Sequence, residues 1–283
     1  MLDNFHELQD HYGSGRLIPF IGAGVSMSVT WEQHGVNKRG PSWKELVDEA
    51  ARQLGFENPE LIRVRGTDLQ ILEYFKLKNA GEFASLTNWL YSEMNPPDDA
   101  LKTSLIHGQL AQLEQCRLFY TTNYDDFIER SFELHGRKCR SVVVEEHIAD
   151  SFRFRDSSEI VKFHGDLRFP NKMVLSESHY ERRLNLSDAM DYRLRSDLLG
   201  RVLLFVGYSF RDWNVSYLFR LVNEEFQRLP GSMTGRRAYI AVPDPSDFET
   251  RLFRDRNIEV IQISGLNQTD DIAGLLSEIR GSR

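Results

Sequence analysis

The 283-residue sequence predicts an α/β protein built on a doubly wound parallel sheet. Two observations support this fold class. Short apolar runs without strict alternation recur along the chain, as expected for strands that are covered on both faces of a parallel sheet. Helical patterns, with apolar residues at steps of three and four, separate most of these runs. Strands and helices that alternate in this way are typical of a sheet sandwiched between helices.

Six segments are expected to form the strands of this sheet. The first five are strongly apolar, whereas the sixth alternates polar and apolar residues and is expected at an edge of the sheet. In chain order the six segments are residues 17–21, 118–121, 160–163, 202–206, 239–242 and 258–263. Helical patterns are expected at residues 125–134, 213–229 and 270–279.

The alternation is interrupted between residues 42 and 115, where the pattern is helical throughout. Ser42 and Glu45 fit a capping box, because the hydroxyl and the carboxylate can each bind a backbone N–H at the start of a helix. A Pro-Pro pair at Pro96 separates these helices from a further one that begins near Asp98. We expect a single domain over residues 1–283, with a core at 1–41 and 116–283 and an inserted helical module at 42–115. Such a module would lie over the carboxyl ends of the strands, where open α/β sheets bind ligands.

Composition argues against several classes of protein. A formal net charge of −7 is unlike the basic footprint of nucleic-acid-binding proteins, so direct binding of nucleic acid is not expected. The mean hydropathy is −0.44, and no apolar run approaches the ~20 residues of a membrane helix. The acidic N-terminal residues do not resemble a signal peptide, so we expect a cytoplasmic protein. Cys116 and Cys139 are too few for a disulfide framework or a four-thiolate zinc site, and no metal is expected.

Two glycines follow the first predicted strand. Gly22 and Gly24 would let the backbone turn tightly and approach a pyrophosphate, while amides at the next helix start hold the anion. The third glycine of the dinucleotide-binding fingerprint is missing, so a plain strand–helix turn is an alternative. The sequence contains no P-loop motif, which argues against a P-loop nucleotidase.

Polar residues follow three other predicted strands. Asn123 and Asp125 come after the second strand, His164 after the third and Ser209 after the fourth. Each also has a purely structural interpretation, with Asp125 and Ser209 as helix caps and His164 as a hydrogen-bonded turn residue. Four strand ends that agree favour a ligand site. A mixed-charge stretch at residues 181–195 is expected to be a solvent-exposed helix, or alternatively a protein contact surface.

Four motifs, in this order, resemble those of the sirtuin (Sir2) family. They are Gly-Ala-Gly-Val-Ser at residues 22–26, Thr-Thr-Asn-Tyr-Asp at 121–125, Phe-His-Gly-Asp at 163–166, and Gly-Tyr-Ser at 207–209 followed by Asp212. The resemblance spans about residues 17–242 and implies a Rossmann-like core of the sirtuin type. The two Cys-x-x-Cys pairs and the Pro-Asp-Phe-Arg stretch of deacylating sirtuins are missing. The sequence is therefore most similar to sirtuin-like proteins of bacterial antiphage defence that hydrolyse NAD⁺.

The resemblance implies a role for each motif, with NAD⁺ as the substrate and nicotinamide and ADP-ribose as products. Asn123 would position the ribose hydroxyls and the attacking water, and Asp125 would orient the nicotinamide or support Asn123. His164 would act as base on a ribose hydroxyl or the water, with a pKa suited to neutral pH. The residues implied to bind the dinucleotide are Gly22, Ala23, Gly24, Ser26, Thr122, Gly207 and Ser209.

Two other functions stay open: an NAD-dependent deacylase without zinc, and a module that binds NAD⁺ or ADP-ribose without turnover. Because an unrestrained NADase would deplete its own cell, some control is expected. The short segments 1–16 and 264–283 leave little room for a sensor, so we expect control by assembly. The resemblance implies a homo-oligomer that pairs with a HerA-type ATPase or, second to it, with a short Argonaute-type protein. The helices at 42–115 are the expected contact surface.

Overall fold

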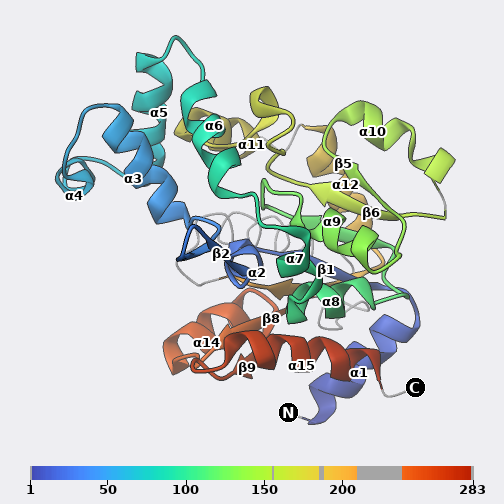
Figure 1. Cartoon of the computed structure of the whole chain (residues 1–283). Coiled ribbons are helices and arrows are strands. Elements are labelled where there is room, and N and C mark those ends of the chain that lie inside the picture. The colour runs from blue at the N-terminus through green and yellow to red at the C-terminus, as the bar shows by residue number, and fades with distance from the viewer. Residues whose placement is uncertain (1, 155, 185–187, 209–237, 282–283) are drawn as a thin grey trace.

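The computed structural model describes residues 2–154, 156–184, 188–208 and 238–281 (Figure 1). Seven strands of the described chain form one parallel sheet in the order β5-β6-β4-β1-β7-β8-β9, which confirms the predicted fold class. The strands are β1 (Leu17–Ile21), β4 (Leu118–Thr121), β5 (Cys139–Val142), β6 (Ser158–Lys162), β7 (Val202–Val206), β8 (Ala238–Pro243) and β9 (Ile258–Ile263). The predicted helix at 213–229, together with Ser209 and Asp212, lies outside the described residues.

All six predicted strands are present, and β9 lies at an edge of the sheet as expected. The edge strand β5 was not predicted, because its sequence is largely polar and only Val142 is fully buried. A short antiparallel hairpin of β2 (Thr30–Gln33) and β3 (Val36–Arg39) was also not predicted. Its two-residue turn places His34 at φ 54° and Gly35 at φ 76°, the left-handed conformation that tight hairpin turns require.

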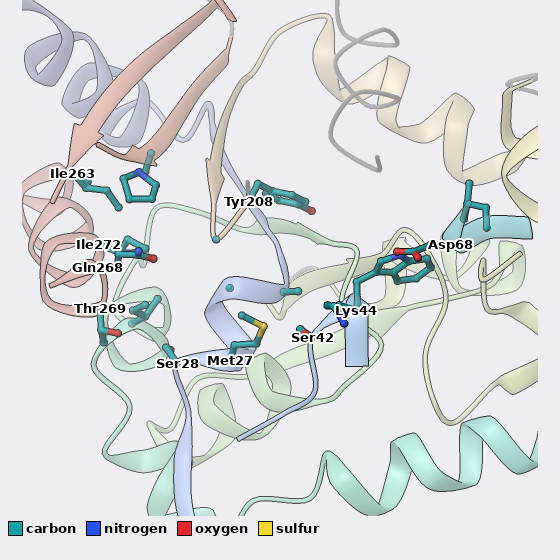
Figure 2. Close-up of a pocket in the computed structure, with 18 of the residues that line it drawn as sticks. Met27, Ser28, Ser42, Lys44, Asp68, Tyr208, Ile263, Gln268, Thr269 and Ile272 are labelled. Atoms are coloured by element: carbon teal, nitrogen blue, oxygen red, sulfur yellow. The ribbon is translucent and has the colours of Figure 1, made fainter. Parts of the chain in front are cut away.

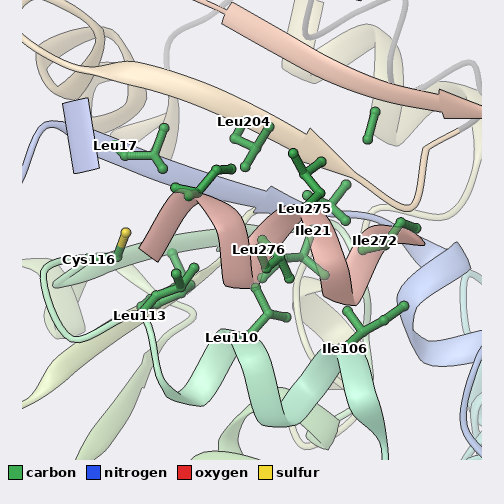
Figure 3. Packing of buried hydrophobic residues seen from close by; sticks show 14 of the residues in the cluster. Leu17, Ile21, Ile106, Leu110, Leu113, Cys116, Leu204, Ile272, Leu275 and Leu276 are labelled. Carbon is green, nitrogen blue, oxygen red and sulfur yellow. The ribbon is translucent and has the colours of Figure 1, made fainter. Parts of the chain in front are cut away.

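Helices cover one face of the sheet with a continuous apolar layer. This layer is made by α1 (Leu2–Gly13), α8 (Leu105–Ala111), α9 (Phe127–Leu134) and α15 (Gln268–Arg280). In Figure 3, Leu275 and Leu276 of α15 lie between Ile21 of β1 and Leu110 of α8. The apolar face of α15 is thus buried between the sheet and α8, which explains why its apolar residues recur at helical spacing.

The opposite face is covered by α10 (Glu145–Ala149), α12 (Ala189–Leu198) and α14 (Asp247–Asp255). Alternate residues of β1 point to opposite faces, so Ile18 and Phe20 pack here. The Phe20 ring stacks between Tyr120 of β4 and Phe205 of β7, with centroid distances of 5.5 and 5.2 Å. Truncation of such a fully buried ring to alanine typically costs about 3–5 kcal/mol, so this stack anchors the centre of the sheet.

Residues 42–115 are helical wherever they form regular structure, as predicted. They contain α3 (Trp43–Gln53), α4 (Pro59–Arg63), α5 (Asp68–Lys78), α6 (Ala84–Glu93), α7 (Asp98–Lys102) and α8. The capping box is present, since the Glu45 amide donates to Ser42 Oγ and the Ser42 amide donates to the Glu45 carboxylate. Helices α3, α5 and α6 share their own apolar cluster, whereas α8 packs on the sheet. The division of the chain at residues 42 and 115 stays a prediction.

Figure 1 shows α3–α6 grouped at one end of the molecule, with α11 (Glu177–Leu184) beside them and both termini near α1 and α15. The helix α2 (Ala23–Met27) follows β1 directly. Among the helices of the described residues, none is long and apolar enough to cross a bilayer.

Candidate active site

A cavity of about 1030 Å³ opens at the carboxyl ends of the central strands. The chain runs from β1 to its neighbour β4 and later crosses to β7 on the other side of β1, so the cavity lies where the strand order reverses. Open α/β sheets bind ligands at such a point. Figure 2 shows Gln268 and Ile272 on one side of the cavity, Lys44 and Asp68 on the other, and Met27 between them.

The loops after β1 and β7 touch one another through their glycines. The Gly22 amide donates to the Val206 carbonyl (2.8 Å), and the Gly24 amide donates to the Gly207 carbonyl (2.9 Å). A Cβ added to Gly22 would lie 2.7 Å from the Gly207 oxygen, and Gly207 itself has φ +75°. The close packing of these two loops is therefore sufficient to require glycine at these positions. Ala23, Gly24 and Gly207 also line the large cavity.

A second, smaller cavity of about 70 Å³ lies beside the first. Its walls include the four polar residues that the motifs singled out around the first two strand ends: Ser26, Thr122, Asn123 and Asp125. Ala23, Ser42 and Trp43 line both cavities, which therefore adjoin. A ligand in the larger cavity can extend one end to Asn123.

A buried hydrogen-bond chain joins the polar residues of the small cavity. Asn123 Nδ2 donates to the Gly22 carbonyl (3.0 Å) and to Ser26 Oγ (2.8 Å), and Ser26 Oγ donates to Asp125 Oδ2 (2.7 Å). The other oxygen of Asp125 accepts the Phe127 amide (3.1 Å), but the N-cap of α9 is Asp126, so the structural interpretation of Asp125 as the helix cap is wrong by one residue. Asn123 Oδ1 is buried and has no partner among the described residues. The amide is thus fixed by its nitrogen while its oxygen is free to bind a ligand.

Thr122, in the wall of the small cavity, is held in place by the hydroxyl of Tyr208. Thr122 Oγ1 lies 2.9 Å from the Tyr208 hydroxyl, which donates to the Ile21 carbonyl (3.1 Å). Tyr208 lines the large cavity and Thr122 the small one. This contact fixes the ends of β1, β4 and β7 relative to one another.

A cluster of buried charges lies behind Asp125. Burial raises the pKa of Asp125, and the nearby Lys162 ammonium opposes this effect. Burial also disfavours the charge of Lys162, but the carboxylates of Glu129 and Asp166 outweigh burial and raise its pKa. Lys162 is therefore a cation held inside the protein by carboxylates.

His164 lies at the end of β6, next to the end of β4, as predicted. Its side chain is fully buried, and neither ring nitrogen has a hydrogen-bond partner among the described residues. The ring packs edge-on against Tyr180 of α11, with centroids 5.4 Å apart, and it does not contribute to the described walls of either cavity. Tyr180 does line the large cavity. The sequence predicted that His164 follows this strand, but it gave no sign that the ring would be buried behind Tyr180.

The prediction that His164 has a pKa suited to neutral pH is wrong for this conformation. Burial, with the positive charge of Arg183 as a second cause, lowers the pKa of His164 well below its ordinary value. His164 is consequently a neutral imidazole throughout the physiological pH range.

Arg183 is a residue of this region that sequence reasoning missed. It belongs to the mixed-charge stretch expected to be one exposed helix, but the stretch forms parts of α11 and α12 and Arg183 is buried. Its guanidinium donates to the Phe163 carbonyl (2.9 Å), stacks over the Phe163 ring (4.2 Å) and pairs with the buried Asp191 (3.3 Å). Buried Met190 and Leu194 within the stretch, and Tyr180 directly before it, are the apolar residues that could have indicated burial.

The described residues contain no group of three or more His, Cys, Asp or Glu side chains that could hold a metal ion. Cys116 and Cys139 are free thiols, and burial raises the pKa of each to about 12. Neither thiol is a reactive thiolate at neutral pH.

Comparison with known proteins supports the motif interpretation. A family model described as "SIR2-like domain" matches residues 117–261, about half of the chain. A protein of Bacillus cereus (strain MSX-D12) named "NAD(+) hydrolase ThsA" is 26% identical over 270 residues, which cover 89% of this chain and 52% of that protein. A protein of Enterococcus faecium with the same name is 30% identical over 219 residues, covering 76% of this chain and 42% of that protein.

The chain therefore spans about half the length of the first of these relatives and less of the second. Among solved structures, one titled "Structural Basis for the Mechanism and Regulation of Sir2 Enzymes" aligns with 98% of both chains at 13% identity and a TM-score of 0.43.

Proposed function

Because the chain belongs to the SIR2-like domain family, we propose that it is an NAD⁺ glycohydrolase, which converts NAD⁺ and water into nicotinamide and ADP-ribose. The observation that carries this proposal is the junction of the two cavities. A large cavity at the strand-order reversal meets a small polar cavity that contains Asn123, Ser26 and Asp125. The names of the relatives support the same substrate.

The two cavities suit the two ends of NAD⁺. At about 1030 Å³, the larger cavity has the volume of a typical ligand site or more, and we assign the adenosine diphosphate part to it. Ala23, Gly24 and Gly207 would face the pyrophosphate there. The nicotinamide end would enter the small cavity, so that the bond to be broken lies near Ala23 and Trp43, which line both.

The reaction breaks the bond between the ribose C1′ and the nicotinamide nitrogen. The electron pair of this bond leaves with nicotinamide, and the ribose develops positive charge like an oxocarbenium ion. Water then bonds to C1′ and loses a proton. The protein must therefore hold the ribose, orient a water and accept that proton.

Asn123 is the residue best arranged for the first two tasks. Its buried Oδ1 accepts no hydrogen bond from the described residues, whereas Nδ2 makes two hydrogen bonds that fix the rotamer. We assign Oδ1 to a ribose hydroxyl or the attacking water. Asp125 supports Asn123 through Ser26 rather than acting on nicotinamide directly, because Ser26 already donates its hydrogen to Asp125.

His164 is the proposed base for the proton that leaves the water or a ribose hydroxyl. In its buried position, desolvation lowers the pKa of His164 and weakens it as a base, so this role requires the ring to become exposed to the ligand. The Tyr180 ring lies against His164, so this role requires a shift of α11 when NAD⁺ is bound.

The test is to incubate the purified chain with NAD⁺ alone, and separately with an acyl-lysine peptide, and to follow nicotinamide and ADP-ribose by chromatography. Release of both products from NAD⁺ alone supports the glycohydrolase. Release that depends on the peptide would instead indicate a deacylase without zinc. Tight binding of NAD⁺ that stays intact over hours would indicate a sensing module.

We also propose that the activity serves bacterial antiphage defence in the cytoplasm and is controlled by assembly. The motif resemblance supports a homo-oligomer with a HerA-type ATPase as partner, ahead of a short Argonaute-type protein. Large apolar side chains lie exposed on α4, α5 and α6, namely Leu61, Leu77 and Tyr91, which supports a contact surface on these helices. Light scattering of the chain, alone and mixed with a candidate partner, tests the assembly. A monomer that is fully active alone would contradict it.

A further inference from the structure

A lysine that the proposed reaction does not use lies directly behind the small cavity. Lys162 is the last residue of β6, and its side chain is completely buried. Its ammonium donates to the backbone carbonyl of Asp125 and lies 3.5 Å from Glu129 Oε1 and 3.6 Å from Asp166 Oδ2. Lys162 is thus the cation that joins the loop after β4 to the loop after β6.

We propose that Lys162 is a positioning residue for the reaction, which holds the Asp125 loop in place through the Asp125 carbonyl and the ion pairs with Glu129 and Asp166. Its positive charge also lowers the pKa of Asp125 and so favours the carboxylate form. This inference rests on the proposed function for its link to catalysis. The carboxylate form matters because Asp125 accepts hydrogen bonds on both oxygens, from Ser26 and from the Phe127 amide. A protonated Asp125 would lose acceptor strength, and the Asn123 rotamer fixed through Ser26 would loosen.

The burial of this lysine is difficult to explain by packing alone. An ammonium taken from water into a protein interior loses several kcal/mol of hydration, which only well-placed partners offset. An apolar side chain of similar volume would fill the same space without that cost. What the ammonium adds is one hydrogen bond to the Asp125 backbone carbonyl and two ion pairs, with Glu129 and Asp166.

The charges around Asp125 come from three directions. Lys162 approaches from β6. Glu129 belongs to α9, and Asp126 is the N-cap of that helix. Asp166 and Arg168 lie in the loop after β6. Burial raises the pKa of Asp125, Lys162 is the strongest charge that lowers it, and Glu129 raises it. Loss of the Lys162 charge should therefore raise the pKa of Asp125, whereas loss of the Glu129 charge should lower it.

The first test compares Lys162→Met with Glu129→Gln, with Lys102→Met on the exposed surface of α7 as a control. The pH dependence of kcat/KM for NAD⁺ hydrolysis is measured for each folded variant. We expect kcat of Lys162→Met to fall at least about 10-fold while KM changes less than about 3-fold, because Lys162 lines neither cavity. Its acid midpoint should rise by about one pH unit, the usual effect of a lost neighbouring charge.

The acid midpoint of Glu129→Gln should move in the opposite direction, to lower pH. A general loss of stability cannot shift two midpoints in opposite directions. If the midpoints of both variants coincide with that of the wild type, the proposal is overturned. If Lys162→Met fails to fold, the acid midpoint of Glu129→Gln alone tests the proposal, because Lys162 keeps its Asp166 partner in that variant. A midpoint at or above that of the wild type would then overturn the proposal.

The second test needs no activity. The free energy of unfolding is measured across pH for the wild type, Lys162→Met, Asp125→Asn and the double variant. Because the folded pKa of Asp125 is already raised, ionising it costs stability as pH rises, and Lys162 reduces that cost. The destabilisation by Lys162→Met should thus grow between pH 4 and pH 7, and grow less in the Asp125→Asn background.

Equal growth in both backgrounds would overturn the Lys162–Asp125 coupling, whether or not the wild type hydrolyses NAD⁺. A wild type that releases no nicotinamide but shows the coupling would overturn the proposed function and leave the electrostatic link between Lys162 and Asp125 established.

Discussion

The ends of β4 and β6 are neighbours in the sheet, and each carries part of the proposed active site, yet they are built differently. At the end of β4, Asn123 lines a cavity and its amide nitrogen makes two hydrogen bonds. At the end of β6, His164 is shut behind Tyr180, and its ring has no hydrogen-bond partner among the described residues. The side chain of Asn123 at the end of β4 therefore faces a cavity, whereas the ring of His164 at the end of β6 faces neither cavity.

For the proposed function, this difference predicts that the binding of NAD⁺ and its turnover depend on different strand ends. In the proposed reaction, Asn123 at the end of β4 binds the nicotinamide end of NAD⁺ without rearrangement, since it already lines the small cavity. The end of β6 becomes part of the same site only if α11 moves its Tyr180 ring. The substitutions below test whether Asn123 and His164 affect the binding and the hydrolysis of NAD⁺ differently.

The largest effect is expected from Asn123→Ala. It removes the free Oδ1 and also the hydrogen bonds to Gly22 and Ser26, so kcat/KM for NAD⁺ should fall by about 10²–10³. Asn88→Ala, on the exposed side of α6, is the matched control and should retain wild-type activity. Steady-state kinetics of nicotinamide release measure both. Near-wild-type turnover by Asn123→Ala would show that the end of β4 is not the site.

A smaller and more selective effect is expected from His164→Ala. Because the ring contributes to neither described cavity wall, the dissociation constant for NAD⁺ should change less than about 3-fold, while kcat falls by about 10². Calorimetric titration and single-turnover kinetics separate the two quantities. Loss of NAD⁺ binding with kcat preserved would reverse the comparison between the two strand ends.

The surroundings of Asn123 at the end of β4 could be predicted from the sequence better than those of His164 at the end of β6, and the reason is physical. Asn123 and Asp125 follow their strand directly, and the residues that fix them, Gly22 and Ser26, belong to another recognised motif. The surroundings of His164 come from α11 and α12, which lie further along the chain in a stretch rich in charge. Single-sequence patterns mark that stretch as solvent-exposed, because they cannot show that Arg183 finds Asp191 and the Phe163 carbonyl.

The same limit applies to Lys162 and to β5. A lysine inside a strand pattern gives no sign that Glu129 and Asp166 will meet it in space. The polar edge strand β5 is stabilised by its ladder with β6 rather than by its own apolar residues. The central strands could be predicted because a strand that is buried on both faces is a continuous apolar run, which is visible in its own sequence.

A further prediction concerns stability at low pH. The folded pKa of His164 is depressed, so the neutral ring contributes stability that is present above its unfolded pKa of about 6.5 and is lost as pH falls below it. The free energy of unfolding should therefore fall less steeply below pH 6.5 in His164→Ala than in the wild type. The difference cannot exceed about 1.4 kcal/mol per pH unit, the value for one proton.

Chemical denaturation at several pH values measures these slopes. Identical slopes in His164→Ala and the wild type would mean that the ring is accessible to protons in the folded protein, contrary to its closed position.

No effect is expected from removal of metal ions. Among the described residues no cluster of metal-ligating side chains lies at either strand end or elsewhere. Dialysis against a chelator should leave the melting temperature unchanged, whereas loss of a structural zinc would remove on the order of 10 kcal/mol of binding free energy. Stoichiometric zinc in elemental analysis of the folded protein would contradict this expectation.

The most direct test of the account is a crystal structure of Asn123→Ala soaked with NAD⁺, in which slow turnover leaves the dinucleotide intact. We expect the adenosine diphosphate part in the large cavity between Gly24 and Gly207, and the nicotinamide in the small cavity beside Ser26 and Asp125. Tyr180 should be displaced from His164. NAD⁺ bound outside these two cavities, or with its nicotinamide away from the end of β4, would contradict the proposed site.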